Sequence, residues 1–135
     1  MSRFNDTKVD LENETVEIGP GLTWDQVYET LSPTGVNVVG GRVSGVGVAG
    51  LILGGGESLP SSDSWPHSHM LAGYSYLTNQ HGLSIDNVAG YELVLPNGTI
   101  KDVTSEDEDL WFGLRVSIHR LVKLASLTLF IRREG

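Results

Sequence analysis

Glycine is concentrated in one segment of this chain, and that segment limits what the chain can fold into. Eight glycines lie between Gly40 and Gly56, in the run GGRVSGVGVAGLILGGG. Each interior glycine destabilises a helix or strand by roughly 0.5–1 kcal/mol relative to alanine, so we expect neither element here. The pattern instead predicts a loop whose backbone approaches something flat or phosphorylated, because bare N–H groups form anion-binding concavities. A glycine-rich turn with a purely structural role is the alternative.

The same segment contains a G-x-G-x-x-G pattern from Gly45 to Gly50, which is typical of dinucleotide-binding Rossmann folds. In those folds the pattern links a strand to a long helix, and an acidic residue follows about 20 positions later. Here only Leu51 to Leu53 separate the pattern from the next three glycines. We therefore reject a Rossmann interpretation.

Composition narrows the class of partner. The length of 135 residues allows one small domain, and a net charge of -8 argues against nucleic acid and anionic membranes. Cysteine is absent, which excludes disulfides and thiolate metal sites. We expect no membrane helix and no signal peptide, because no apolar run has the required length. The compartment stays open, although the sequons at Asn5, Asn13 and Asn97 would be usable in the secretory pathway.

The remaining pattern is strand-rich with two helices. It predicts a hairpin over residues 9–18, a helix capped by Thr23, a buried strand over 36–39, a hairpin over 91–103 and a helix capped by Ser105. The expected fold class is α+β, an antiparallel or mixed sheet with flanking helices. The aromatic side chains of Trp24, Tyr91 and Trp111 are expected in the core.

Three further motifs flank the glycine-rich segment: IGPGLTWDQVYETL before it, and GLSIDNVAGYELVLPNGTI and DLWFGLR after it. In this order and spacing, the set resembles the FAD-binding domain of the FAD-linked oxidases related to vanillyl-alcohol oxidase. The closest similarity is to the fungal branch of the berberine-bridge-enzyme-like group. The resemblance implies the second half of a PCMH-type FAD-binding domain, with FAD as cofactor, a small-molecule substrate and relatives that are typically secreted.

The resemblance also implies two groups of cofactor-binding residues. The glycine-rich group is Gly40, Gly41, Arg42, Ser44, Gly45, Val46, Gly47, Gly50, Gly54, Gly55 and Gly56, and the later group is Gly82, Asp86, Asn87 and Val88. Val43 stands where members with two covalent flavin links have a cysteine, so a second link is not expected. The sequence predicts no catalytic residue. It also predicts no metal site, because His67 and His69 offer two ligands where a metal needs three or four.

The chain departs from the family pattern in two places. Residues 57–73 interrupt the motif after Gly56, and residues 116–135 replace the expected continuation after Arg115. Both stretches can be encoded with splice signals at their ends, so we interpret them as translated introns. This interpretation divides the chain into a partial FAD-binding domain over 1–115, with an exposed, mobile insert loop over 57–73, and an aberrant tail over 116–135. We expect apolar residues of the tail to pack on the sheet, as a strand over 125–131 or as a helix.

Two functions remain open from the sequence. One is the FAD-binding fragment of a flavin-dependent oxidoreductase that oxidises an alcohol, sugar or similar carbon centre with oxygen as acceptor. The other is a catalytically inactive variant that acts at most as a structural or interaction module. The sequence matches neither the family's Arg-Gly-Gly-x-His loop, which holds the FAD pyrophosphate, nor its substrate domain. We therefore expect the isolated chain to bind FAD weakly or not at all, and to be inactive alone.

Overall fold

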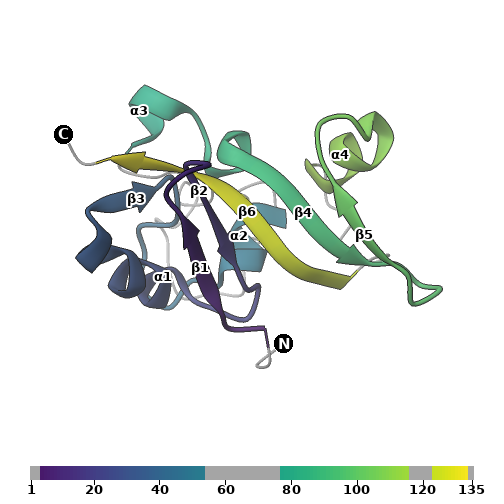
Figure 1. Cartoon of the computed structure of the whole chain (residues 1–135), viewed down its shortest axis with the longest axis horizontal. Coiled ribbons are helices and arrows are strands. Elements are labelled where there is room, and N and C mark those ends of the chain that lie inside the picture. The colour runs from purple at the N-terminus through teal and green to yellow at the C-terminus, as the bar shows by residue number, and fades with distance from the viewer. Residues whose placement is uncertain (1–3, 54–76, 116–122, 134–135) are drawn as a thin grey trace, which may run out of the picture.

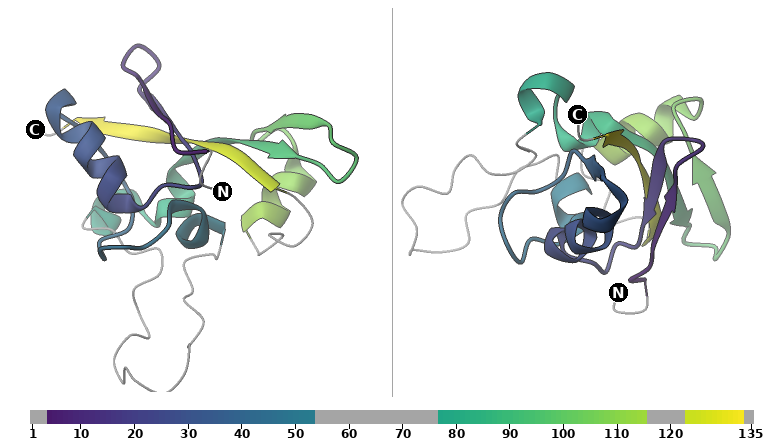
Figure 2. Two further views of the ribbon diagram at one scale, coloured as in Figure 1. Left: turned by 90° about the horizontal axis from the view of Figure 1, so that it is seen from below. Right: turned by 60° about the vertical axis from the view of Figure 1, so that its left-hand side comes forward.

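The computed structural model describes residues 4–53, 77–115 and 123–133. Within these ranges the strands form one antiparallel sheet in the order β1-β2-β6-β4-β5, and β3 pairs with the far end of β6 (Figure 1). The strands are β1 (Thr7–Asp10), β2 (Thr15–Ile18), β3 (Val36–Val38), β4 (Val88–Val94), β5 (Ile100–Val103) and β6 (Lys123–Arg133). The helices α1 (Trp24–Leu31), α2 (Val48–Leu53) and α4 (Glu108–Arg115) lie on one side of the sheet (Figure 2). The predicted α+β class is confirmed.

Strand β6 occupies the middle of the sheet. It pairs with β2 along one edge, where Leu129 faces Val16, and with β4 along the other, where Leu127 faces Tyr91. Leu127 and Leu129 are buried, as expected for apolar residues that alternate along a central strand, and Leu124 is buried beyond a register shift in the pairing of β4 with β6. The prediction that the tail packs on the sheet is thus confirmed for residues 123–133, and they form a strand, not a helix.

This position of β6 bears on the expected division of the chain after Arg115, which stays a prediction. Residues 123–133 share one sheet with the strands that precede Arg115, because β6 supplies the hydrogen-bonding partner for both β2 and β4. They therefore belong to the same sheet, as expected for a tail that packs on it. Their origin from a translated intron stays a prediction.

Local sequence signals place most other elements. Both predicted hairpins are present, as β1–β2 and β4–β5. The Thr23 N–H donates to Gln26 Oε1 at 3.0 Å at the start of α1, as the predicted cap requires. Helix α4 begins at Glu108, later than a cap at Ser105 implies. The reason is a preceding turn, in which the Asp107 N–H donates to the Thr104 carbonyl at 3.0 Å.

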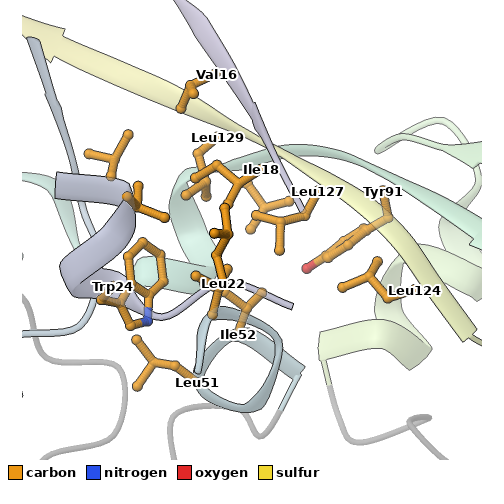
Figure 3. Packing of buried hydrophobic residues seen from close by; sticks show 14 of the residues in the cluster. Val16, Ile18, Leu22, Trp24, Leu51, Ile52, Tyr91, Leu124, Leu127 and Leu129 are labelled. Carbon is orange, nitrogen blue, oxygen red and sulfur yellow. The ribbon is translucent and has the colours of Figure 1, made fainter. Parts of the chain in front are cut away.

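The core lies between the sheet and the helices α1 and α2 (Figure 3). Trp24 and Tyr91 are buried, with exposed fractions of 1% and 2%, and Trp111 packs partly buried against the same cluster. The three aromatic side chains are therefore core residues, as predicted. The core fixes α2, and with it one end of the glycine-rich segment, beneath the sheet.

Several predictions concern residues that lie outside the described ranges. They include the insert over 57–73, the glycines Gly54, Gly55 and Gly56, and the pair His67 and His69. Among the described helices, none has both the length and the apolar character needed to cross a membrane.

Candidate functional site

The first two glycines of the segment are packing positions. Gly40 and Gly41 are both buried against the indole of Trp24. A Cβ added at Gly40 would overlap Trp24 Cζ3, and one added at Gly41 would lie 2.5 Å from Trp24 Cδ1. The flat group that these two glycines approach is therefore a side chain of the same protein. Gly40 and Gly41 therefore have a purely structural role, which is the alternative named above for the glycine-rich segment.

The next glycine forms a turn whose anion position is already filled. Gly45 has a left-handed φ of 78°, and its N–H donates to Asp25 Oδ2 at 2.6 Å. The Ser44 hydroxyl donates to the same oxygen at 3.3 Å. The anion bound by this turn is the carboxylate of Asp25, at the first turn of α1. A phosphate would have to displace it to reach the Gly45 amide.

The expectation that the segment contains no helix is wrong for its second half. Helix α2 begins at Val48 and includes Gly50. Val48, Leu51 and Ile52 are buried in the core, whereas Gly50 is exposed. Burying large apolar side chains contributes about 1.5–3 kcal/mol each, which exceeds the cost of about 1 kcal/mol for one helical glycine.

Gly47 and Gly50 present open backbone. Both are exposed, and a Cβ added at either position would have no heavy atom within 4 Å. Gly47 forms a β-bridge with Thr23, which fixes its position relative to α1. Packing does not explain either glycine, so both leave room for an external molecule; Gly45 is also open on its Cβ side, but its N–H is bound to Asp25. Of the other candidates nearby, Arg42 and Ser44 are exposed and Val46 is half-buried.

The second predicted group stabilises a turn. Gly82 has a left-handed φ of 79°, and the Asp86 carboxylate accepts the Leu83 N–H at 3.1 Å. The other Asp86 oxygen pairs with Arg115 at 2.9 Å. Gly82 and Asp86 are exposed, and Val88 is buried. Asp86 thereby ties the turn to α4.

Asn87, which is 2% exposed, uses its amide entirely within the protein. Its Nδ2 donates to the carbonyls of His81 and Leu83, both at 2.9 Å, and its Oδ1 accepts from Arg132 at 2.9 Å. These contacts use both donor hydrogens of the amide, and its oxygen accepts one hydrogen bond within the protein. The role of Asn87 in this structure is to join the turn over 81–83 to strand β6.

The fold brings the two predicted groups together. Helix α2 contacts the 3-10 helix η2 (Ser84–Asn87), and α2 also contacts α4. The open backbone at Gly50 and the turn that begins at Gly82 thus belong to neighbouring elements on the helical side of the sheet (Figure 2).

Among the described residues, Tyr91 is the buried ionisable side chain with the largest change in pKa. Burial raises the pKa of Tyr91 to about 12, although the nearby Arg115 acts to lower it. With that pKa the Tyr91 hydroxyl stays protonated at neutral pH, and it has no hydrogen-bond partner among the described residues. Among the described residues, no group of three or more histidine, aspartate or glutamate side chains could hold a metal.

A hollow of about 350 Å³ lies on a different part of the sheet. It is lined by residues of β2, β4, β5 and β6, including Glu17, Glu92, Asp102 and Thr128. These residues alternate along their strands with the buried core residues, so they belong to the face that points away from α1 and α2. The hollow is separate from the glycine-rich segment.

Comparison with known proteins identifies relatives of this chain. No protein-family model matches the chain. The chain is 42% identical over 116 residues to the FAD-dependent monooxygenase FUP4 of Fusarium proliferatum, and 37% identical over 116 residues to the FAD-dependent monooxygenase macF of Penicillium terrestre. Each alignment covers 85% of the chain. The chain is related to the fungal FAD-linked oxidoreductases. It spans 19% of the length of the first relative and 20% of the second.

Two solved structures share the fold of this chain. It superposes on 6-hydroxy-D-nicotine oxidase from Arthrobacter nicotinovorans with a TM-score of 0.78 and 19% identity, covering 98% of this chain and 26% of that one. The BBE-like 1 protein of Physcomitrella patens gives a TM-score of 0.78 with 22% identity, at the same coverage of 98% and 26%. The predicted resemblance to berberine-bridge-enzyme-like FAD-binding domains is confirmed.

No sequence pattern indicates that Asp25 and Tyr28 contact the glycine-rich segment. Asp25 holds the Gly45 turn, and the Tyr28 hydroxyl donates to the Gly41 carbonyl at 2.9 Å. An acidic residue in the first turn of a helix is common, because it opposes the helix dipole. Without the loop conformation, no sequence signal distinguishes Asp25 from any other such residue.

Proposed function

We propose that the chain is the FAD-binding part of a flavin-dependent oxidoreductase, and that FAD contacts the exposed backbone at Gly47 and Gly50. The observation that carries this proposal is the open space beside these two glycines, which lie on a segment that α1 and the core hold in place. The FAD-dependent relatives support the identity of the cofactor.

The described residues fit FAD in part. The bare backbone of Gly47 and Gly50 suits a close approach by a flat ring or an extended chain, and the exposed Arg42 suits a phosphate. The Gly45 N–H and the Asn87 side chain are already engaged within the protein. When bound, the flavin supplies the hydride and electron chemistry, and the chain positions it. Two features of this chain would keep the flavin-contacting backbone in place. They are the packing of the glycine-rich loop on Trp24 and the burial of α2.

The proposed reaction class is oxidation of an alcohol, sugar or similar carbon centre with oxygen as acceptor. Structural neighbours that are sugar oxidases support it: a chitooligosaccharide oxidase and the xylooligosaccharide oxidase of Myceliophthora thermophila. Tyr91, whose pKa is raised to about 12, cannot serve as a base near neutral pH. Because the described residues fit FAD only in part, with the Gly45 N–H and the Asn87 side chain engaged within the protein, we propose that the isolated chain binds the cofactor weakly and does not turn over substrate.

A non-catalytic structural module is the second candidate. The contact between Asp25 and Gly45 favours it, because that carboxylate already satisfies the amide that a phosphate-binding loop would offer to its ligand. In this case the glycine-rich segment only packs against α1, and the open space beside Gly47 has no occupant.

Fluorescence of FAD at a fixed low concentration, titrated with the chain, separates the two candidates. The proposal predicts saturable quenching with a dissociation constant above the micromolar range. It also predicts that Gly47→Ala weakens binding about tenfold, because its methyl group would occupy space left for the ligand. Thr128→Ala, on the opposite face of the sheet, is the matched control and should leave binding unchanged. An absence of saturable quenching would leave only the structural module.

A further inference from the structure

Helix α1 holds the glycine-rich loop at both ends. At one end, the Tyr28 hydroxyl donates to the Gly41 carbonyl at 2.9 Å. At the other end, the Trp24 N–H donates to the Val46 carbonyl at 3.0 Å. The residues between these two anchors form the turn that precedes Gly47, so the conformation of that turn determines how the loop reaches its second anchor.

Asp25 fixes the middle of this loop. Its Oδ2 atom accepts the Gly45 N–H at 2.6 Å and the Ser44 hydroxyl at 3.3 Å. The turn also closes on itself through the Val46 N–H, which donates to the Val43 carbonyl at 3.4 Å, a longer and weaker contact. Hydrogen bonds to a charged group are about twice as strong as neutral ones, so the Asp25 carboxylate is the stronger restraint on the turn.

Asp25 contacts the loop but not the core, so replacing it should change the loop conformation without changing the core. Its side chain is exposed on the first turn of α1, whereas Trp24 and Val27 on either side of it are buried. Removing the carboxylate therefore leaves the core packing unchanged. Glycine is free to leave the left-handed region once the restraint is lost, so the loop rather than the fold would respond.

We propose that Asp25 is a positioning residue: its carboxylate holds the Ser44–Gly45 turn against α1 and thereby sets where Gly47 and Gly50 present their backbone to FAD. This inference rests on the proposed function, because it concerns the same cofactor contact. Asp25 itself need not touch the cofactor. Its negative charge also keeps other anions away from the Gly45 amide.

The test compares Asp25→Ala with Asp25→Asn in the full chain. Asparagine retains a carbonyl oxygen that can accept the Gly45 N–H, whereas alanine retains none. Glu29→Ala is the matched control, because Glu29 is an exposed acid on the same helix. Three quantities are measured in each variant: hydrogen exchange of the Gly45 amide by NMR, the dissociation constant for FAD, and the melting temperature.

We expect Asp25→Ala to speed exchange at Gly45 about tenfold and to weaken FAD binding about tenfold, with the melting temperature almost unchanged. In Asp25→Asn, both the exchange rate at Gly45 and the affinity for FAD should stay close to those of the unmodified chain. Glu29→Ala should change neither the exchange rate nor the affinity. Unchanged FAD affinity in Asp25→Ala, together with faster exchange at Gly45, would overturn this inference alone. Failure of the unmodified chain to bind FAD would overturn the proposed function and this inference with it.

Discussion

The contact between Gly40 and Trp24 yields a sharp prediction about stability. An alanine methyl at Gly40 would overlap Cζ3 and Cε3 of the Trp24 ring, and that ring is only 1% exposed. The ring is rigid and enclosed by the core, so it cannot turn away into solvent. Overpacking of a well-packed core costs about 1–3 kcal/mol, and a rigid neighbour places Gly40→Ala at the upper end of that range.

Gly47→Ala is the matched control. A Cβ there meets no atom within 4 Å, and Gly47 is not in the left-handed region. We expect its free energy of unfolding to stay within about 0.5 kcal/mol of the unmodified chain. Unfolding in urea, followed by circular dichroism, measures both variants. Trp24→Phe removes the outer ring atoms that the new methyl would meet, so the double variant with Gly40→Ala should lose less than the sum of the two single changes.

Two results would refute this reasoning. Equal stability of Gly40→Ala and Gly47→Ala would show that Gly40 is not packed against the indole. A Gly40→Ala variant of normal stability but weakened FAD binding would show that Gly40 is itself a cofactor contact. The account predicts the reverse pattern: Gly40→Ala lowers stability and Gly47→Ala lowers affinity.

Three further predictions concern the sheet and the turn. Leu127→Ala should lower the free energy of unfolding by about 2–5 kcal/mol, and Thr128→Ala on the outer face by much less, as measured by urea unfolding. Asn87→Ala should cost about 2–4 kcal/mol in the same assay, because it leaves two carbonyls and Arg132 without their partner. Tyr91 has a pKa near 10 when unfolded and about 12 when folded, so its stabilising effect is complete below pH 10 and lost as pH rises toward 12. Tyr91→Phe should abolish that loss of about 2–3 kcal/mol; an equal alkaline loss in the variant would contradict the assignment.

Elements with local signals could be predicted from the sequence. The cap of α1 follows from Thr23 and Gln26, three residues apart, and the turn between β4 and β5 follows from Pro96 and Gly98. Helix α2 could not be predicted, because its glycine content opposes a helix and only burial of Val48 and its neighbours in the core overrides that preference.

The sequence predicts where the candidate site lies, but not which of its residues pack against the core and which stay open. The resemblance located the segment, and the fold brings it next to the turn that contains Asn87. Which glycine serves packing and which stays open depends on where the Trp24 ring lies, and that is a tertiary contact. The internal hydrogen bonding of the Asn87 amide depends in the same way on Arg132, which comes from a distant part of the chain.

A map of FAD contacts by NMR tests the central claim most directly. Amide shifts of the nitrogen-15-labelled chain are followed while FAD is added to millimolar concentration. The account predicts shifts that saturate together at Gly47 and Gly50 and in the turn that begins at Gly82, with none at Thr128 on the opposite face of the sheet. Saturating shifts confined to the outer face, or no shifts at any FAD concentration, would contradict it.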